Sequence, residues 1–129
     1  MHILIVDDQE SHLLLLSTLL EGIGYAAVTA QNGQEALKYL HGAVDLPDFI
    51  LLDMAMPQMS GWDFLHAQEE EARLAAIPVI VMTALGPLAH KKMPPSVIAM
   101  LDKPFDLSEL ERLLSTHSET QLEMRAVGN

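Results

Sequence analysis

The chain has 129 residues, half of them hydrophobic and only 5% aromatic, which allows one domain with an aliphatic core. Seven Lys and Arg against 18 Asp and Glu give a net charge of −11, so the chain lacks the basic surface needed to bind nucleic acid or anionic membranes. The absence of cysteine excludes disulfides, thiolate chemistry and Cys-based zinc sites.

Strand-like and helical patterns alternate along the chain. Apolar runs predict strands at about residues 2–7, 25–30, 49–52, 77–82 and 97–101, and helical periodicity predicts helices at about 9–22, 34–41, 62–75, 88–93 and 106–117. This alternation is typical of an α/β fold, a doubly wound five-stranded parallel sheet with helices on both faces. Residues 118–129 show no periodicity, so we expect a domain over 1–117 and a disordered tail over 118–129.

The start of the chain predicts its compartment. It begins almost directly in a strand, and no apolar run approaches the ~18 residues of a membrane span. We therefore expect a cytoplasmic protein with no signal peptide and no membrane contact.

Acidic residues end two of the predicted strands. The run Ile3–Val6 stops at Asp7 and Asp8, and the run 49–52 stops at Asp53. Adjacent carboxylates repel one another and resist desolvation, so a buried strand has no structural reason to end in this way. A hard cation such as Mg²⁺, which prefers oxygen ligands, would explain the pattern.

Polar residues also follow the last two strands. Thr83 ends one run, and Lys103 comes shortly after the other. Ligands of open parallel sheets bind beyond the carboxyl ends of the strands, so five side chains can converge on one crevice: Asp7, Asp8, Asp53, Thr83 and Lys103. Three acids, a hydroxyl and an ammonium make a site for a metal and a phosphoryl group.

Several motifs occur together in a fixed order. They are V-D-D at 6–8, Gly24-Tyr25, N-G-Q-E-A-L at 32–37, D-M-A-M-P-Q-M-S-G at 53–61, V-M-T-A at 81–84 and K-P-F at 103–105. In this order the chain resembles the receiver domain of two-component response regulators over about residues 3–114. The resemblance implies the flavodoxin-like strand order 2-1-3-4-5.

The resemblance also implies a phosphoacceptor. Asp53 would be the nucleophile that takes a phosphoryl group from a histidine kinase or a histidine phosphotransfer protein. Thr83 would hydrogen-bond one phosphoryl oxygen, and Lys103 would pair with another. The Lys103–Pro104 bond is then a candidate cis peptide.

Mg²⁺ is the cofactor that the resemblance implies. Asp8 would bind the ion directly, and Asp7 would act through water or at longer range. Asp53 and the backbone carbonyl of Ala55 would complete the protein ligands. The function implied is that of a signalling phosphoacceptor, a monomer or weak dimer, with only limited self-phosphorylation and self-dephosphorylation.

Two departures from the family favour an alternative function. Met100 stands where receivers usually carry an aromatic residue, and the helix predicted at 88–93 is short and bounded by prolines. The alternative is a protein-interaction module that acts independently of phosphorylation. A small phosphohydrolase is a weaker alternative, because Ala55 stands where such enzymes need a second acid.

Three structural interpretations compete with functional ones. Asp7 and Asp8 could cap the first helix instead of binding a metal. The six histidines, with no paired i, i+4 spacing, are expected at surface or packing positions. Leu14 and Leu15 lie off the buried face of the first helix, where they are either isolated exposed residues or part of a partner surface.

Overall fold

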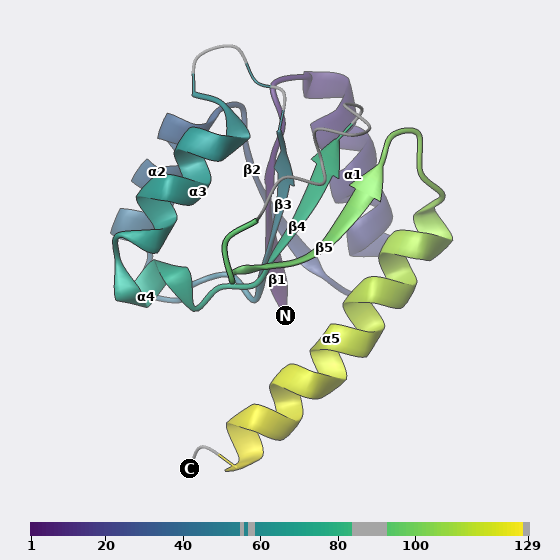
Figure 1. Ribbon diagram of the computed structural model, residues 1–129. Helices are drawn as coiled ribbons and strands as arrows, with labels where there is room; N and C mark the ends of the chain where they lie inside the picture. Colours follow the sequence, from purple (N-terminus) through teal and green to yellow (C-terminus); the bar gives the residue numbers. More distant parts are fainter. Residues whose placement is uncertain (55, 57–58, 84–92, 128–129) are drawn as a thin grey trace.

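The computed structural model describes residues 1–54, 56, 59–83 and 93–127, with side chains described as far as residue 118. Five parallel strands form one sheet in the order β2-β1-β3-β4-β5 (Figure 1). They are β1 (His2–Val6), β2 (Ala26–Ala30), β3 (Phe49–Asp53), β4 (Val79–Thr83) and β5 (Val97–Asp102). The predicted fold class and strand order are confirmed.

Within the described part of the chain, five helices cover the two faces of the sheet. They are α1 (Glu10–Gly22), α2 (Gly33–Gly42), α3 (Gly61–Glu69), α4 (Ala72–Ala75) and α5 (Leu107–Val127). In Figure 1, α1 and the start of α5 lie on one side of the sheet, and α2, α3 and α4 lie on the other. Within the described residues, no helix has the length and apolar character needed to cross a membrane.

The strands supply both hydrophobic cores because successive side chains point to opposite faces. In β1, Leu4 and Val6 pack with residues of α2 and α3, whereas Ile3 and Ile5 pack with residues of α1 and α5. All four side chains are fully buried. The central strands must therefore be apolar at every position, because a polar side chain anywhere in β1 would be buried in one of the two hydrophobic cores.

Local sequence signals set the helix ends that lead into and out of the sheet. The Ser60 hydroxyl oxygen accepts a hydrogen bond from the backbone N–H of Asp63, and the Asp63 carboxylate accepts one from the backbone N–H of Ser60, which completes a capping box at the start of α3. At the end of α1, Gly24 adopts a φ of 101°, a left-handed conformation that favours glycine. The chain then turns directly into β2.

The helix predicted over 62–75 is two helices. α3 ends at Glu69, and Glu71 is extended before α4 begins. The side-chain amide of buried Gln68 donates to the carbonyls of Leu74 and Ile77, at 2.9 and 3.1 Å. These bonds tie α3 to α4 and to the residue after it, and Leu74 and Ile77 are buried there.

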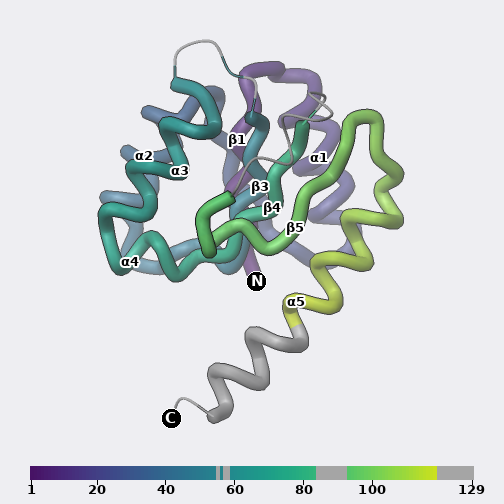
Figure 2. Tube along the Cα trace, in the orientation of Figure 1, coloured from purple at the N-terminus to yellow at the C-terminus, as the bar shows by residue number. Residues whose placement is uncertain are grey.

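The end of the chain also differs from the prediction. α5 continues to Val127, so residues 118–127, expected as a disordered tail, are helical. The segment contains Leu, Met, Glu, Arg and Ala, which are good helix formers, and neither Gly nor Pro occurs before Gly128. The helical propensity of these residues thus accounts for the helix, although the segment has no apolar periodicity. The part of α5 whose side chains are described packs against the sheet, where Leu110 and Leu114 are fully buried (Figure 2). The helix predicted at 88–93 falls on residues 88–92, which are outside the described part of the chain.

Candidate functional site at the carboxyl edge of the sheet

Three carboxylates meet where β1 and β3 end. Asp7 directly follows β1, and Asp53 is the last residue of β3. One oxygen from each of Asp7, Asp8 and Asp53 lies within 4.8 Å of the others. Asp7 and Asp53 are buried, while Asp8 is exposed at the mouth of the cluster. The predicted convergence of these acids is confirmed.

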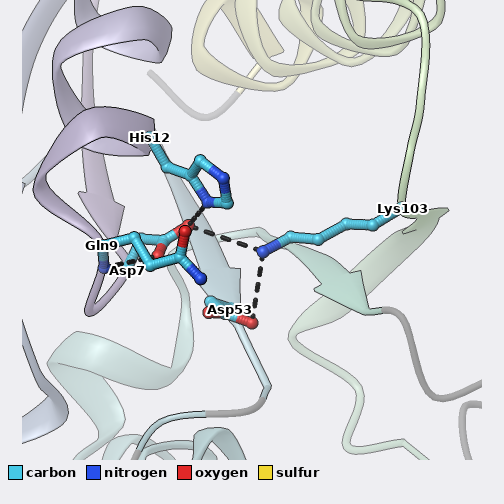
Figure 3. Close-up of polar contacts among 5 residues, drawn as sticks. All are labelled: Asp7, Gln9, His12, Asp53 and Lys103. Carbon is cyan, nitrogen blue, oxygen red and sulfur yellow. Dashed lines mark hydrogen bonds and ion pairs between the residues drawn. The ribbon is translucent and has the colours of Figure 1, made fainter.

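Lys103 brings a positive charge to the carboxylate cluster from the segment after β5. It follows β5, and its backbone N–H donates to the carbonyl of Thr83 at 2.8 Å. Its Nζ lies 3.6 Å from Oδ2 of Asp7 and 3.6 Å from Oδ1 of Asp53 (Figure 3). The ammonium is therefore shared equally by two buried carboxylates. The Lys103–Pro104 peptide is cis, as predicted.

The Asp7 carboxylate is held by donors from the start of α1. The backbone N–H of Gln9 donates to its Oδ1 at 2.9 Å, and the ring Nδ1 of His12 donates to its Oδ2 at 3.3 Å. The N-cap of α1 is Gln9, which makes no side-chain cap bond. Neither Asp7 nor Asp8 is therefore the N-cap of α1, although the Asp7 carboxylate accepts a hydrogen bond from the N–H of the N-cap residue.

Sequence reasoning placed His12 among surface and packing histidines, yet its ring contacts the acidic cluster (Figure 3). The sequence contains only a weak indication of this contact. His12 is five residues after Asp7, so a short connection and the first turn of α1 can bring the two side chains close together. Periodicity within the helix cannot show this contact, because Asp7 lies outside the helix.

Thr83 ends β4 on the same edge of the sheet. In the strand register Asp53 is opposite Met82, so Thr83 stands one residue further along the neighbouring strand. Its side chain is buried, with 2% of its surface exposed. A buried hydroxyl at this strand end is in the position predicted from the sequence.

The chain after Asp53 is folded tightly against the site. The backbone N–H of Met54 donates to the carbonyl of Met82 at 3.1 Å, and that of Gly61 donates to the carbonyl of Met54 at 3.2 Å. A Cβ at Gly61 would lie 2.7 Å from Cα of Met54 and 3.1 Å from the carbonyl oxygen of Asp53. Only glycine fits there without moving the backbone that carries Asp53. Ala55, a predicted metal ligand through its carbonyl, lies outside the described residues.

The donor set fits a hard divalent cation. Three carboxylate oxygens lie close together, and one ammonium leaves an excess of negative charge. Mg²⁺ binds through one or two carboxylates together with water and phosphate oxygens, which this half-open cluster permits because Asp8 is exposed. The described side chains at the cluster therefore match Mg²⁺ in ligand type and charge.

An apolar cavity of about 490 Å³ adjoins the cluster between α1 and the start of α5. Its walls include Leu15, Leu19, Phe105 and Leu107, and Asp7, His12 and Lys103 line its inner end. Leu14 and Leu15 are 70% and 57% exposed, which confirms that they lie off the buried face of α1. The site thus opens onto an apolar surface.

Comparison with known proteins identifies a matching family and several relatives. The family model of the response regulator receiver domain matches residues 3–115. The probable transcriptional regulator ycf27 of Guillardia theta is 38% identical over 111 residues, covering 84% of this chain and 42% of that protein. The response regulator Rre1 of Synechocystis is 34% identical, covering 87% of this chain and 49% of that protein. The chain spans less than half the length of these relatives.

Solved structures share the same architecture. A response regulator receiver domain protein from Clostridium thermocellum superposes with a TM-score of 0.82 at 27% identity, covering 95% of this chain and 98% of that one. The response regulator TrrA of Thermotoga maritima, solved in complex with Mg²⁺ and BeF, gives a TM-score of 0.78 at 28% identity, covering 89% of this chain and 96% of that one.

Proposed function

The chain belongs to the response regulator receiver domain family, and from this membership we propose that it accepts a phosphoryl group on Asp53 and then changes its binding to a partner protein. The donor is a phosphohistidine of a histidine kinase or histidine phosphotransfer protein. One observation carries the proposal: buried Asp53 lies within 4.8 Å of two further carboxylates and 3.6 Å from the ammonium of Lys103.

The transfer requires one bond to form and one to break. A carboxylate oxygen of Asp53 attacks the phosphorus of the phosphohistidine, an O–P bond forms, and the N–P bond breaks. The ring nitrogen of the donor keeps the bonding electron pair and then takes a proton from water. Such transfers depend on positioning and on charge neutralisation more than on covalent catalysis. Lys103 supplies part of that neutralisation, since its Nζ is already 3.6 Å from Asp53.

Thr83 and Lys103 would hold the arriving group from two sides. Thr83 stands at the end of the neighbouring strand, where its hydroxyl can donate to a phosphoryl oxygen. The Lys103 ammonium can form an ion pair with a second phosphoryl oxygen, because its side chain extends from the residue after β5 to the cluster. Each group replaces water that would otherwise solvate the charge on the phosphoryl group.

Mg²⁺ is the proposed cofactor. Asp8 and Asp53 would bind it directly, with the carbonyl of Ala55 as a third protein ligand and Asp7 at longer range. When bound, the ion neutralises charge on the phosphoryl oxygens. The excess of carboxylates over ammonium groups supports this role, because an incoming phosphoryl group would otherwise be repelled.

The apolar cavity beside the site is the proposed surface for the phosphohistidine donor. A helix of the donor that packs on Leu15 and Phe105 would bring its phosphohistidine toward Asp53, since Asp7 and Lys103 line the inner end of the same cavity. Leu15, which is exposed on α1 and lines this cavity, supports this surface. We propose a cytoplasmic chain that acts as a monomer or weak dimer, without direct contact to nucleic acid.

A second candidate function rests on Met100. This residue of β5 is 38% exposed and occupies the position where receivers usually carry an aromatic residue. A flexible, unbranched side chain makes a poor two-state element, which favours partner binding that does not depend on phosphorylation.

Intact-mass measurement tests the proposed function. The chain is incubated with acetyl phosphate, with and without Mg²⁺, alongside Asp53→Asn and the matched control Asp102→Asn, which changes an exposed carboxylate next to Lys103. We expect one Mg²⁺-dependent phosphoryl adduct in the wild type and the control. An adduct that persists in Asp53→Asn would move the acceptor to another residue.

A further inference from the structure

We propose that His12 is a positioning residue of the Mg²⁺ site, which acts by fixing the orientation of the Asp7 carboxylate. The inference rests on the proposed function, because it assigns His12 a part in the metal site of that function. It concerns a residue outside the receiver motifs, whose ring reaches the acidic cluster from α1.

Among the described residues, two hydrogen-bond donors and one ammonium contact the Asp7 carboxylate. The Gln9 backbone N–H holds Oδ1 at 2.9 Å. The His12 ring and the Lys103 ammonium both contact Oδ2, at 3.3 and 3.6 Å, and reach it from different elements, α1 and the segment after β5 (Figure 3). A carboxylate that is held at both oxygens cannot rotate freely, so its lone pairs keep one direction relative to Asp8 and Asp53.

Lys103 cannot serve this purpose throughout the reaction. Its Nζ is equally distant from Asp7 and Asp53, at 3.6 Å from each. In the proposed transfer it pairs with a phosphoryl oxygen on Asp53 and must weaken its contact with Asp7. The hydrogen bonds from Gln9 and His12 then remain, and the bond from His12 is the one to Oδ2.

The position of His12 on the helix suits this role. Its backbone N–H donates to the carbonyl of Gln9 at 3.0 Å, so the residue belongs to the first, well-anchored turn of α1. Leu13 and Leu16 fix that part of the helix in the core. The ring is therefore presented to Asp7 by a rigid element, and the His12 side chain, 39% exposed, lines the apolar cavity. Partners that orient metal ligands in this way commonly change metal affinity by 10–100-fold when removed.

Direct Mg²⁺ binding tests the proposal without any phosphodonor. Mg²⁺ is titrated by calorimetry, and by amide shifts of Asp7 and Asp8, into the wild type, His12→Leu and His12→Asn. His66→Leu is the matched control, because it makes the same change at an exposed histidine of α3. The Asn amide nitrogen can take the place of the ring Nδ1, so it separates loss of the hydrogen bond from loss of the ring.

We expect His12→Leu to bind Mg²⁺ about tenfold more weakly than the wild type, and His12→Asn to recover most of the loss. His66→Leu should match the wild type. With acetyl phosphate, the Mg²⁺ concentration for half-maximal phosphorylation should rise in His12→Leu, while the rate at saturating Mg²⁺ changes little.

Three results would overturn the role of His12: Mg²⁺ binding in His12→Leu that is unchanged, binding that is tighter, or equal losses in His12→Leu and His12→Asn. These outcomes are distinct from failure of the proposed function. If the wild type took no phosphoryl group on Asp53, the titration with Mg²⁺ alone would still decide the role of His12.

Discussion

Replacing Asp8 by Asn should stabilise the metal-free fold and remove most of its response to Mg²⁺. Asp8 is the exposed member of a cluster whose oxygens lie within 4.8 Å of one another. At that distance two unit charges repel by about 0.9 kcal/mol in bulk water and by about 3.5 kcal/mol at an effective dielectric constant of about 20. Since Asp8 is exposed and Lys103 offsets part of the repulsion, we expect a gain of about 1 kcal/mol in the free energy of unfolding.

Mg²⁺ should reverse the order of stability. A ligand that binds only the folded state at 100 times its dissociation constant adds about 2.7 kcal/mol to the free energy of unfolding. The wild type should gain this amount, and Asp8→Asn should gain little because a direct ligand has been lost. The variant is thus the more stable protein without Mg²⁺ and the less stable one with it.

Urea unfolding with EDTA or with saturating Mg²⁺ measures both effects. With a slope of about 2 kcal/mol/M, a change of 1 kcal/mol moves the midpoint by about 0.5 M. Asp45→Asn is the matched control, because Asp45 is an exposed acid in the connection between α2 and β3. Equal gains from Mg²⁺ in the wild type and Asp8→Asn would refute direct ligation by Asp8.

Three further predictions concern the fold around the site. Gly61→Ala should lower the free energy of unfolding by about 2 kcal/mol, because its Cβ would lie 2.7 Å from Cα of Met54; a urea midpoint equal to that of the wild type would show that the loop yields freely. Gln68→Leu should cost about 2–3 kcal/mol in the free energy of unfolding, since the carbonyls of Leu74 and Ile77 each lose a hydrogen bond from the Gln68 amide. Hydrogen exchange should rise first in the turn between α3 and α4, and a uniform rise would contradict this. A beryllofluoride mimic should shift amides near Thr83 strongly and those of β5 around Met100 only slightly; equally large shifts along β5 would show a full switch.

The sequence predicted the sheet and the acidic cluster well, for a physical reason. Strands buried on both faces must be continuously apolar, so the charged residues that end them, such as Asp7 and Asp53, stand out. In a parallel sheet these ends share one edge, and convergence follows without knowledge of the loops. The cluster within 4.8 Å confirms that reasoning.

Features that depend on tertiary contacts were missed. The division between α3 and α4 is set by the Gln68 amide, which binds carbonyls six and nine residues away. The contact between His12 and Asp7 joins a helix to the loop before it, so neither strand nor helix periodicity reports it. The helix over 118–127 was missed for another reason. Apolar periodicity indicates which face of a helix is buried, whereas this segment is helical through the intrinsic propensity of its residues.

Reductive trapping of the phosphorylated chain tests the central claim most directly. After incubation with acetyl phosphate and Mg²⁺, borohydride reduces an aspartyl phosphate to homoserine, and peptide sequencing by mass spectrometry locates the converted residue. We predict homoserine at position 53 alone, formed only when Mg²⁺ is present. Conversion at Asp7 or Asp8, or no conversion at any aspartate, would contradict the assignment of Asp53 as the phosphoacceptor.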